Sequence, residues 1–126
     1  MCIRDCSLTI LFISHDLSVI NQIADRVMVM YLGHIVEVAS TKNLFSNPRH
    51  PYTKSLIETA PQIFRKNENK ILLKGDIPSP INPPSGCVFR TRCPHASKDN
   101  KEANIEMGLI EVAQDHWVDR CAINCN

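Results

Sequence analysis

Glycine is scarce in this sequence, and its scarcity excludes one large class of sites. The 126 residues contain 4 glycines, at positions 33, 75, 86 and 108, and each stands alone. A loop that cradles phosphate groups needs closely spaced glycines followed by a lysine, so that backbone N–H groups can approach the phosphate oxygens. The sequence therefore contains no glycine-rich phosphate-binding loop.

Long apolar runs and a strong charge imbalance are also missing. The longest apolar runs, residues 8–13 and 27–32, are far shorter than the roughly 20 residues that span a bilayer. A formal net charge of +1 gives no electrostatic reason to expect binding to nucleic acid or to phospholipid. We therefore expect no nucleic-acid partner and contact with a membrane only through other proteins.

The first residues lack the features of a secretion signal. Residues 1–6 contain one basic residue and no apolar core, so a cytosolic, reducing setting is expected. In such a setting the six cysteines are interpreted as thiols or metal ligands before disulfides.

Residues 7–60 have the pattern of an α/β unit with the order strand, helix, strand and hairpin. The apolar, β-branched run at 7–14 predicts a strand buried on both faces, as in a parallel sheet. Asp16 is a candidate N-cap for a helix over 16–24. Residues 25–32 predict another buried strand, and a tight turn at Gly33-His34 leads into a strand at 35–38.

Two further helices are expected after this hairpin. The first covers 41–47, begins at Ser40 or Thr41 and stops before Pro48. The second covers 50–60, with Pro51 near its first position, and Pro61 ends it.

The expected strand at 7–14 needs neighbours that the sequence does not provide. Parallel neighbours are joined by crossover helices, and only residues 1–6 precede this strand. We therefore expect that the domain began well before Met1. Residues 1–6 match neither a helix nor a strand and are left unassigned, as a candidate artefact of how the sequence was obtained.

Residues 61–126 differ in composition from the part before them. Residues 65–70 predict an exposed loop and 71–73 a brief strand. Four of the eight prolines fall within 76–85, which forces an extended, stiff connector. A cysteine-containing tail follows over 87–126, with a short helix expected at 104–112.

Several segments together resemble a known family of transporter ATPases. Residues 11–17, Leu-Phe-Ile-Ser-His-Asp-Leu, resemble the H-switch of ABC ATPases, and 24–27 with 30–33 resemble the strand pair that follows it. Residues 47–53, Asn-Pro-Arg-His-Pro-Tyr-Thr, and the run at 75–94 are similar to the C-terminal extension of oligopeptide and dipeptide importer ATPases. The resemblance covers residues 8–121 and implies the C-terminal remnant of an ABC ATPase domain over 7–60, followed by that extension over 61–126.

This resemblance implies a function that the chain cannot perform alone. The family uses ATP and magnesium, and its ATPase subunits drive peptide import through membrane permeases. By resemblance, His15 is the residue that senses the γ-phosphate of ATP. The phosphate-binding loop, signature loop, glutamine loop and catalytic glutamate of the family are absent from the sequence, so we expect no ATP hydrolysis by the chain itself.

The same resemblance implies partners and a location. These are a second ABC ATPase subunit in a homo- or heterodimer, two membrane permease subunits and, indirectly, an extracytoplasmic peptide-binding protein. The expected location is cytoplasmic, peripheral on the inner face of the cell membrane through the permeases.

In some members of the family the extension carries four cysteines that are associated with an iron-sulfur cluster. Cys87 and Cys93 match the first two positions and Cys121 resembles the last, whereas Asn100 stands at the third. Because thiolates are what such clusters bind, Asn100 interrupts the set. Cys125 could substitute, or His95 or His116 could complete a zinc site. The structural alternative is that the cysteines are buried as small apolar side chains.

Two functions of other classes are weighed against the transporter interpretation. The first is a small metal-binding or redox module built on Cys87, Cys93, Cys121 and Cys125. The second is a Cys/His hydrolase, which ranks last because no motif directs His15, His34 or His50 towards a defined nucleophile.

Overall fold

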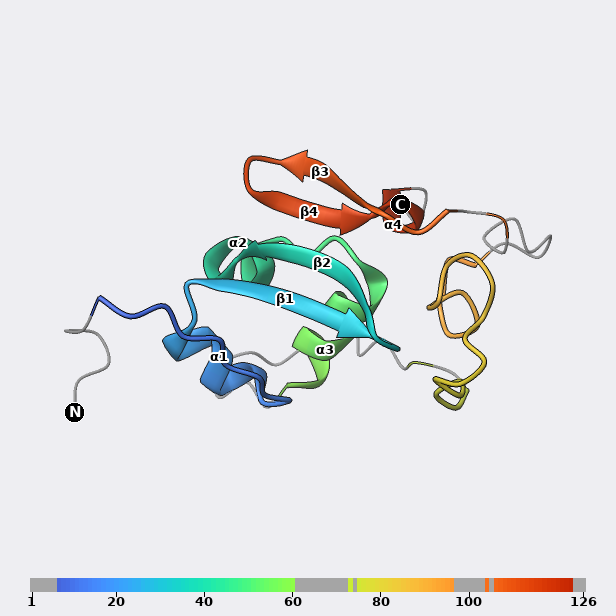
Figure 1. The fold of residues 1–126 in the computed structure, drawn as a ribbon, viewed down its shortest axis with the longest axis horizontal. Coiled ribbons are helices and arrows are strands. Elements are labelled where there is room, and N and C mark those ends of the chain that lie inside the picture. Colours follow the sequence, from blue (N-terminus) through green and yellow to red (C-terminus); the bar gives the residue numbers. More distant parts are fainter. Residues whose placement is uncertain (1–6, 61–72, 74, 97–103, 105, 124–126) are drawn as a thin grey trace.

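The structure is a computed structural model that describes residues 7–60, 73, 75–96, 104 and 106–123. Its elements in chain order are α1 (Leu17–Ile23), β1 (Arg26–Tyr31), β2 (His34–Ser40), α2 (Thr41–Ser46), α3 (Pro51–Thr59), β3 (Leu109–Ala113), β4 (His116–Asp119) and α4 (Arg120–Ile123), as labelled in Figure 1. The expectations for residues 1–6, for the stop at Pro61, for the loop at 65–70 and for most of the strand at 71–73 lie outside the described residues.

The sheet is antiparallel, which corrects the expectation of a parallel one. Its four strands lie in the order β1-β2-β4-β3, and every neighbouring pair is antiparallel. The predicted hairpin is confirmed as β1–β2, although its turn lies one residue earlier than predicted, at Leu32 and Gly33. Both residues have positive φ angles, 48° and 77°, the combination that matches the twist of the two flanking strands.

The tail supplies half of this sheet. β4 pairs with β2 through Glu37↔Val118 and Val38↔Trp117, and β3 pairs with β4. The predicted helix at 104–112 is therefore wrong, because Leu109–Ala113 forms β3. Pairing with β4 supplies backbone hydrogen bonds that a short local pattern could not reveal, and it outweighs helix propensity.

The predicted strand at 7–14 is also wrong in the described structure. These residues form no helix or strand, and five of their side chains are exposed large hydrophobics: Leu8, Ile10, Leu11, Phe12 and Ile13. A strand that is apolar on both faces is stable only between neighbouring strands, and no described strand pairs with this segment. The neighbouring strands that such a pattern requires are not among the described residues.

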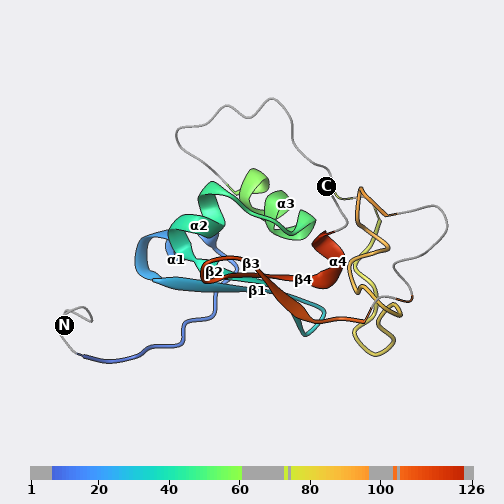
Figure 2. The same cartoon turned by 90° about the horizontal axis from the view of Figure 1, so that it is seen from above.

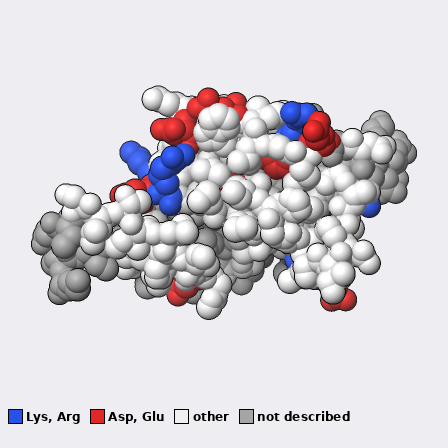
Figure 3. Space-filling view, viewed as in Figure 1, with Lys and Arg blue, Asp and Glu red and all other residues white. Residues whose placement is uncertain are grey.

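Helices of the described residues cover only one of the two faces of the sheet (Figure 2). In β1 the side chains alternate, with Val27, Val29 and Tyr31 buried and the residues between them exposed, so the expectation of a strand buried on both faces is corrected. The helices lie on one side of the sheet (Figure 2). On the opposite side Met28 and Met30 are 54% and 57% exposed. The middle of the surface in Figure 3 carries few charged side chains.

Local capping rules explain why the first three helices begin where they do. Asp16 caps α1, Ser40 caps α2, and the side chain of His50 caps α3 by accepting a hydrogen bond from the Tyr52 amide. Pro51 occupies the first turn of α3, where its missing N–H is no loss. These starts confirm the predicted helices at 16–24, 41–47 and 50–60 to within two residues.

The proline-rich connector contains no helix or strand over 75–86, as predicted. Within the described part of the chain, we find no helix with the length and apolar character that crossing a membrane requires.

Candidate functional site

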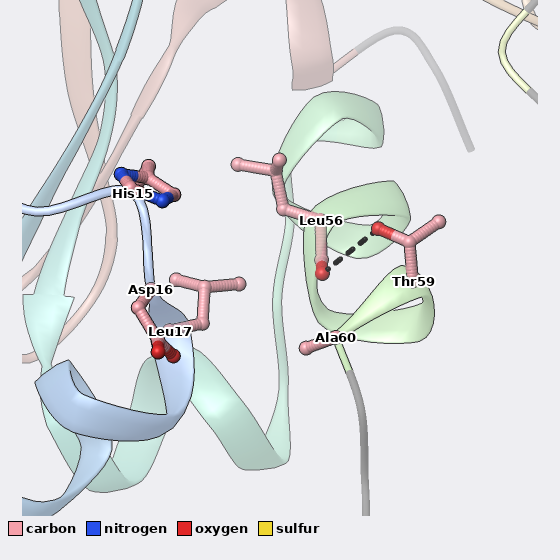
Figure 4. Close-up of a pocket in the computed structure, with 6 residues that line it drawn as sticks. All are labelled: His15, Asp16, Leu17, Leu56, Thr59 and Ala60. Carbon is pink, nitrogen blue, oxygen red and sulfur yellow. Dashed lines mark hydrogen bonds between the residues drawn. The ribbon is translucent and has the colours of Figure 1, made fainter.

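His15 lies at the edge of a hollow between the start of α1 and the end of α3. The hollow has a volume of about 270 Å³ and is lined by His15, Asp16, Leu17, Leu56, Thr59 and Ala60 (Figure 4). The His15 side chain is exposed, and α3 forms the wall on the other side of the hollow. An imidazole in this position is accessible to a ligand that enters the hollow.

Asp16 fixes the direction of the chain immediately after His15. Its Oδ1 atom accepts hydrogen bonds from the Ser18 amide at 2.9 Å and the Val19 amide at 3.4 Å, and also from the Ser18 hydroxyl. The hydrogen bond from the Ser18 hydroxyl is the largest cause that lowers the pKa of Asp16 below 3.8. Because these bonds favour the carboxylate form, the start of α1 is held in one geometry beside His15.

A cluster of aromatic rings joins α3 to the extension. The Phe89 ring centroid lies 5.1 Å from that of Tyr31, 5.5 Å from that of Tyr52 and 5.4 Å from that of His50. Phe89 is fully buried, whereas Tyr52 is half-buried and its pKa is raised, first by burial and then by Tyr31. Tyr52 therefore packs within the protein, and the motif at 47–53 touches the extension directly.

Glu37 is the centre of a buried polar cluster. Its carboxylate accepts the Arg49 amide at 2.8 Å and the His50 amide at 2.9 Å, and its Oε1 atom lies 2.6 Å from Nε2 of His116. Both side chains are buried, with exposed fractions of 0% for Glu37 and 2% for His116. An ionised carboxylate only accepts, so the Nε2–H tautomer of His116 is the one that makes this hydrogen bond as donor. Sequence reasoning missed this cluster, although a glutamate inside the apolar run of residues 35–38 is a signal that could have indicated it.

The three candidate metal-binding cysteines pack in or against the hydrophobic core. Cys87 and Cys121 belong to the core cluster, and half-buried Cys93 packs against it. Within the described residues no three His, Cys, Asp or Glu side chains are arranged to hold a metal ion. Asn100 and Cys125 lie outside the described residues, His95 is exposed, and His116 is bonded to Glu37. The described residues therefore do not fit an iron-sulfur cluster or a zinc ion.

The hydrolase alternative gains no support at His15. Neither cysteine nor serine is among the residues that line its hollow, so no nucleophile of that kind is placed there by the described structure.

Comparison with known proteins gives the chain a family. The family described as "Oligopeptide/dipeptide transporter, C-terminal region" matches residues 36–99, which is just over half of the chain. The chain belongs to this family. The matched residues run from β2 through α2 and α3 to the segment that carries Phe89, so the family region contains Glu37 and most of the aromatic cluster.

Individual relatives extend the similarity beyond that region. The chain is 50% identical over 111 residues to the putative oligopeptide transport ATP-binding protein YkfD of Bacillus subtilis, a match that covers 86% of this chain and 34% of the relative. It is 52% identical over 99 residues to the oligopeptide transport ATP-binding protein OppF of Salmonella typhimurium, covering 76% of this chain and 30% of OppF. A putative peptide import ATP-binding protein of Brucella ovis is 58% identical over 91 residues, covering 71% of this chain and 28% of the relative. The chain thus spans about a third of the length of these relatives.

Proposed function

We propose that this chain forms the C-terminal part of the ATP-binding subunit of an oligopeptide or dipeptide ABC importer, which couples ATP hydrolysis to peptide import. The observation that carries the proposal is the 50% identity over 111 residues to an oligopeptide transport ATP-binding protein. The family region of peptide transporters, residues 36–99, supports the same substrate class.

Within this function His15 is the sensor of the γ-phosphate. Its exposed ring beside an open hollow supports that role, since an imidazole can donate a hydrogen bond to a phosphate oxygen. The chain's own residues do not fit ATP or magnesium, because a sequence with 4 isolated glycines has no loop to hold the phosphates. The nucleotide is therefore held by another part of the subunit, and the chain alone does not hydrolyse ATP.

The partners that follow from this function are a second ATPase subunit, two membrane permease subunits and, through them, an extracytoplasmic peptide-binding protein. The subunit then lies in the cytoplasm, on the inner face of the membrane. The middle of the surface in Figure 3 carries few charged side chains, which supports burial of this face against other polypeptide.

A chimera tests this proposal. Residues 7–126 replace the corresponding C-terminal region of Salmonella typhimurium OppF, and uptake of a labelled oligopeptide is measured in cells that lack OppF. We expect the chimera to restore uptake and the His15→Ala chimera to abolish it while still accumulating to the same level.

The matched control is His34→Ala, which removes another exposed histidine outside the hollow. It should leave uptake unchanged. A folded, accumulating chimera without uptake would contradict the proposed function, and uptake that survives His15→Ala would contradict the role of His15 alone.

A further inference from the structure

Glu37 connects two parts of the chain that are far apart in sequence. His116 reaches it from β4, 79 residues later, and the amides of Arg49 and His50 reach it from the start of α3. Val118 lies directly opposite Glu37 in the β2–β4 pair, and His116 shares its side of β4 because side chains alternate along a strand. The register of the tail therefore brings the imidazole to the carboxylate.

The far end of α3 lies at the His15 hollow. α3 begins at Pro51, directly after the two amides bonded to Glu37, and its last turn contributes Leu56 and Thr59 to the wall of the hollow. A helix of nine residues is about 13 Å long and moves as one body, since each turn is hydrogen-bonded to the next. A shift at the start of α3 is therefore carried to the hollow.

We propose that His116 is a positioning residue for the His15 hollow, acting through Glu37 and α3. Its Nε2–H bond holds the Glu37 carboxylate in the orientation that also accepts the Arg49 and His50 amides. The tail hairpin β3–β4 is then a brace for the sensor site rather than an independent module. The proposal rests on the proposed function for the role of the hollow, but the connection itself is a property of this chain.

His116 can position the start of α3 because one oxygen of the Glu37 carboxylate has two hydrogen-bond partners. Oε1 of Glu37 accepts both the His116 ring and the Arg49 amide, at 2.6 and 2.8 Å. Without the imidazole, a fully buried carboxylate loses a hydrogen bond that nothing in the apolar core replaces. It then rotates or admits water, and the amides that start α3 lose their fixed acceptor.

Two substitutions of His116 separate positioning from general stability. His116→Leu fills the space but has no donor, whereas the amide nitrogen of His116→Gln lies near the former Nε2 position and can donate to Glu37. Val118→Ala weakens packing of the same strand and leaves the bond intact, so it serves as the control for destabilisation.

The first readout is hydrogen exchange of the Arg49 and His50 amides in this chain, together with the NMR shifts of His15 and Thr59. His116→Leu should speed exchange at both amides by about tenfold, because a lost buried hydrogen bond changes the opening equilibrium by roughly that factor. It should also move the His15 and Thr59 signals. His116→Gln should restore the slow exchange of the two amides and the original His15 and Thr59 signals. Val118→Ala should move the His15 signal less than His116→Leu does.

The second readout uses the OppF chimera, in which the KM for ATP and kcat are measured separately. His116→Leu should change KM or kcat by about tenfold and His116→Gln should recover most of it, as expected for one hydrogen bond. If the parent chimera has no ATPase activity, the proposed function fails, and the exchange and NMR data still decide the connection. The positioning role is overturned if His116→Leu leaves exchange and the His15 signal unchanged, if His116→Gln behaves like His116→Leu, or if an active chimera keeps its kinetic constants.

Discussion

The Phe89 ring stands almost perpendicular to the Tyr31 ring, at an interplanar angle of 88° and a centroid distance of 5.1 Å. This edge-to-face contact joins the last residue of β1 to the extension, 58 positions later in the sequence. Tyr52 of α3 contacts both rings, so the two segments that resemble the importer extension, 47–53 and 75–94, are packed against each other. The extension is thus part of the same hydrophobic core as the hairpin.

Removing the Phe89 ring should therefore destabilise the whole described fold. Phe89→Ala should lower the free energy of unfolding by about 3–5 kcal/mol, because it leaves a cavity among buried aromatic rings. Trp117, which is half-buried in β4 and is the single tryptophan in the sequence, reports unfolding in urea by its fluorescence.

Phe12→Ala is the matched control, since Phe12 is 49% exposed. It should change stability by less than about 0.5 kcal/mol, as is usual for surface substitutions. Phe89→Leu keeps most of the apolar volume and should fall between the two, which preserves a measurable transition if Phe89→Ala does not fold. Equal midpoints for the two alanine variants would show that Phe89 is not part of the core.

The first three helices could be predicted because their starts depend on neighbouring residues. Asp16, Ser40 and Pro51 act on backbone groups within three residues, so their effects can be read from a short stretch of sequence. The strand at 7–14 and the helix at 104–112 failed because their conformations depend on pairing with distant strands. The β-hairpin at 109–119 is stabilised by β2, which no local pattern indicates.

The candidate site was predictable only in part for the same reason. His15 was proposed as a site residue from its motif, but its proximity to Leu56 and Thr59 depends on how α3 packs. Glu37 and His116 are 79 residues apart, and only the register between β2 and β4 brings them together. The sequence left Cys87, Cys93 and Cys121 open between metal ligands and buried apolar side chains, because their packing in or against the core depends on long-range contacts.

The capping role of Asp16 leads to a prediction about pH. The lowered pKa means that, as the pH falls towards and below 3.8, the unfolded chain takes up a proton at Asp16 before the folded chain does. The cap therefore contributes stability above pH 3.8 that is lost as the pH falls through the folded-state pKa. An NMR titration of the side-chain carboxyl should give a value below 3.8.

Ser18→Ala should raise this pKa towards 3.8, because the Ser18 hydroxyl is the largest cause of its lowering. Ser46→Ala provides the comparison: its hydroxyl donates to the Asn43 carbonyl in α2 and does not touch Asp16. A value at or above 3.8 in the unmodified chain, or equal shifts in the two variants, would disprove the prediction.

The cysteines lead to a prediction about metal removal. Since no three ligands are grouped within the described residues, EDTA should leave the urea midpoint unchanged, and purified protein should be colourless with less than one zinc per chain.

The burial of the cysteines also predicts unequal effects of their substitution on stability. Cys87→Ala, at a position that is 2% exposed, should destabilise more than Cys93→Ala, which is half-buried. Equal losses from the two variants together with a brown colour or stoichiometric zinc would instead establish a metal site.

The exposed apolar segment at 8–13 and the outer edge of β1 should make the isolated chain associate. Leu11 and Ile13 are 77% and 88% exposed, and no described strand pairs with the outer edge of β1. Such a segment and an open strand edge favour contact between copies, so apparent mass in light scattering should rise with protein concentration. Leu11→Lys combined with Ile13→Lys should reduce this rise, because association would then bury two charges.

Ile77→Lys with Ile81→Lys is the control, since both isoleucines are exposed on the connector, outside this surface. A soluble monomer with a sharp unfolding transition that is independent of concentration would contradict the prediction, and an equal effect of the two double variants would attribute association to net charge instead.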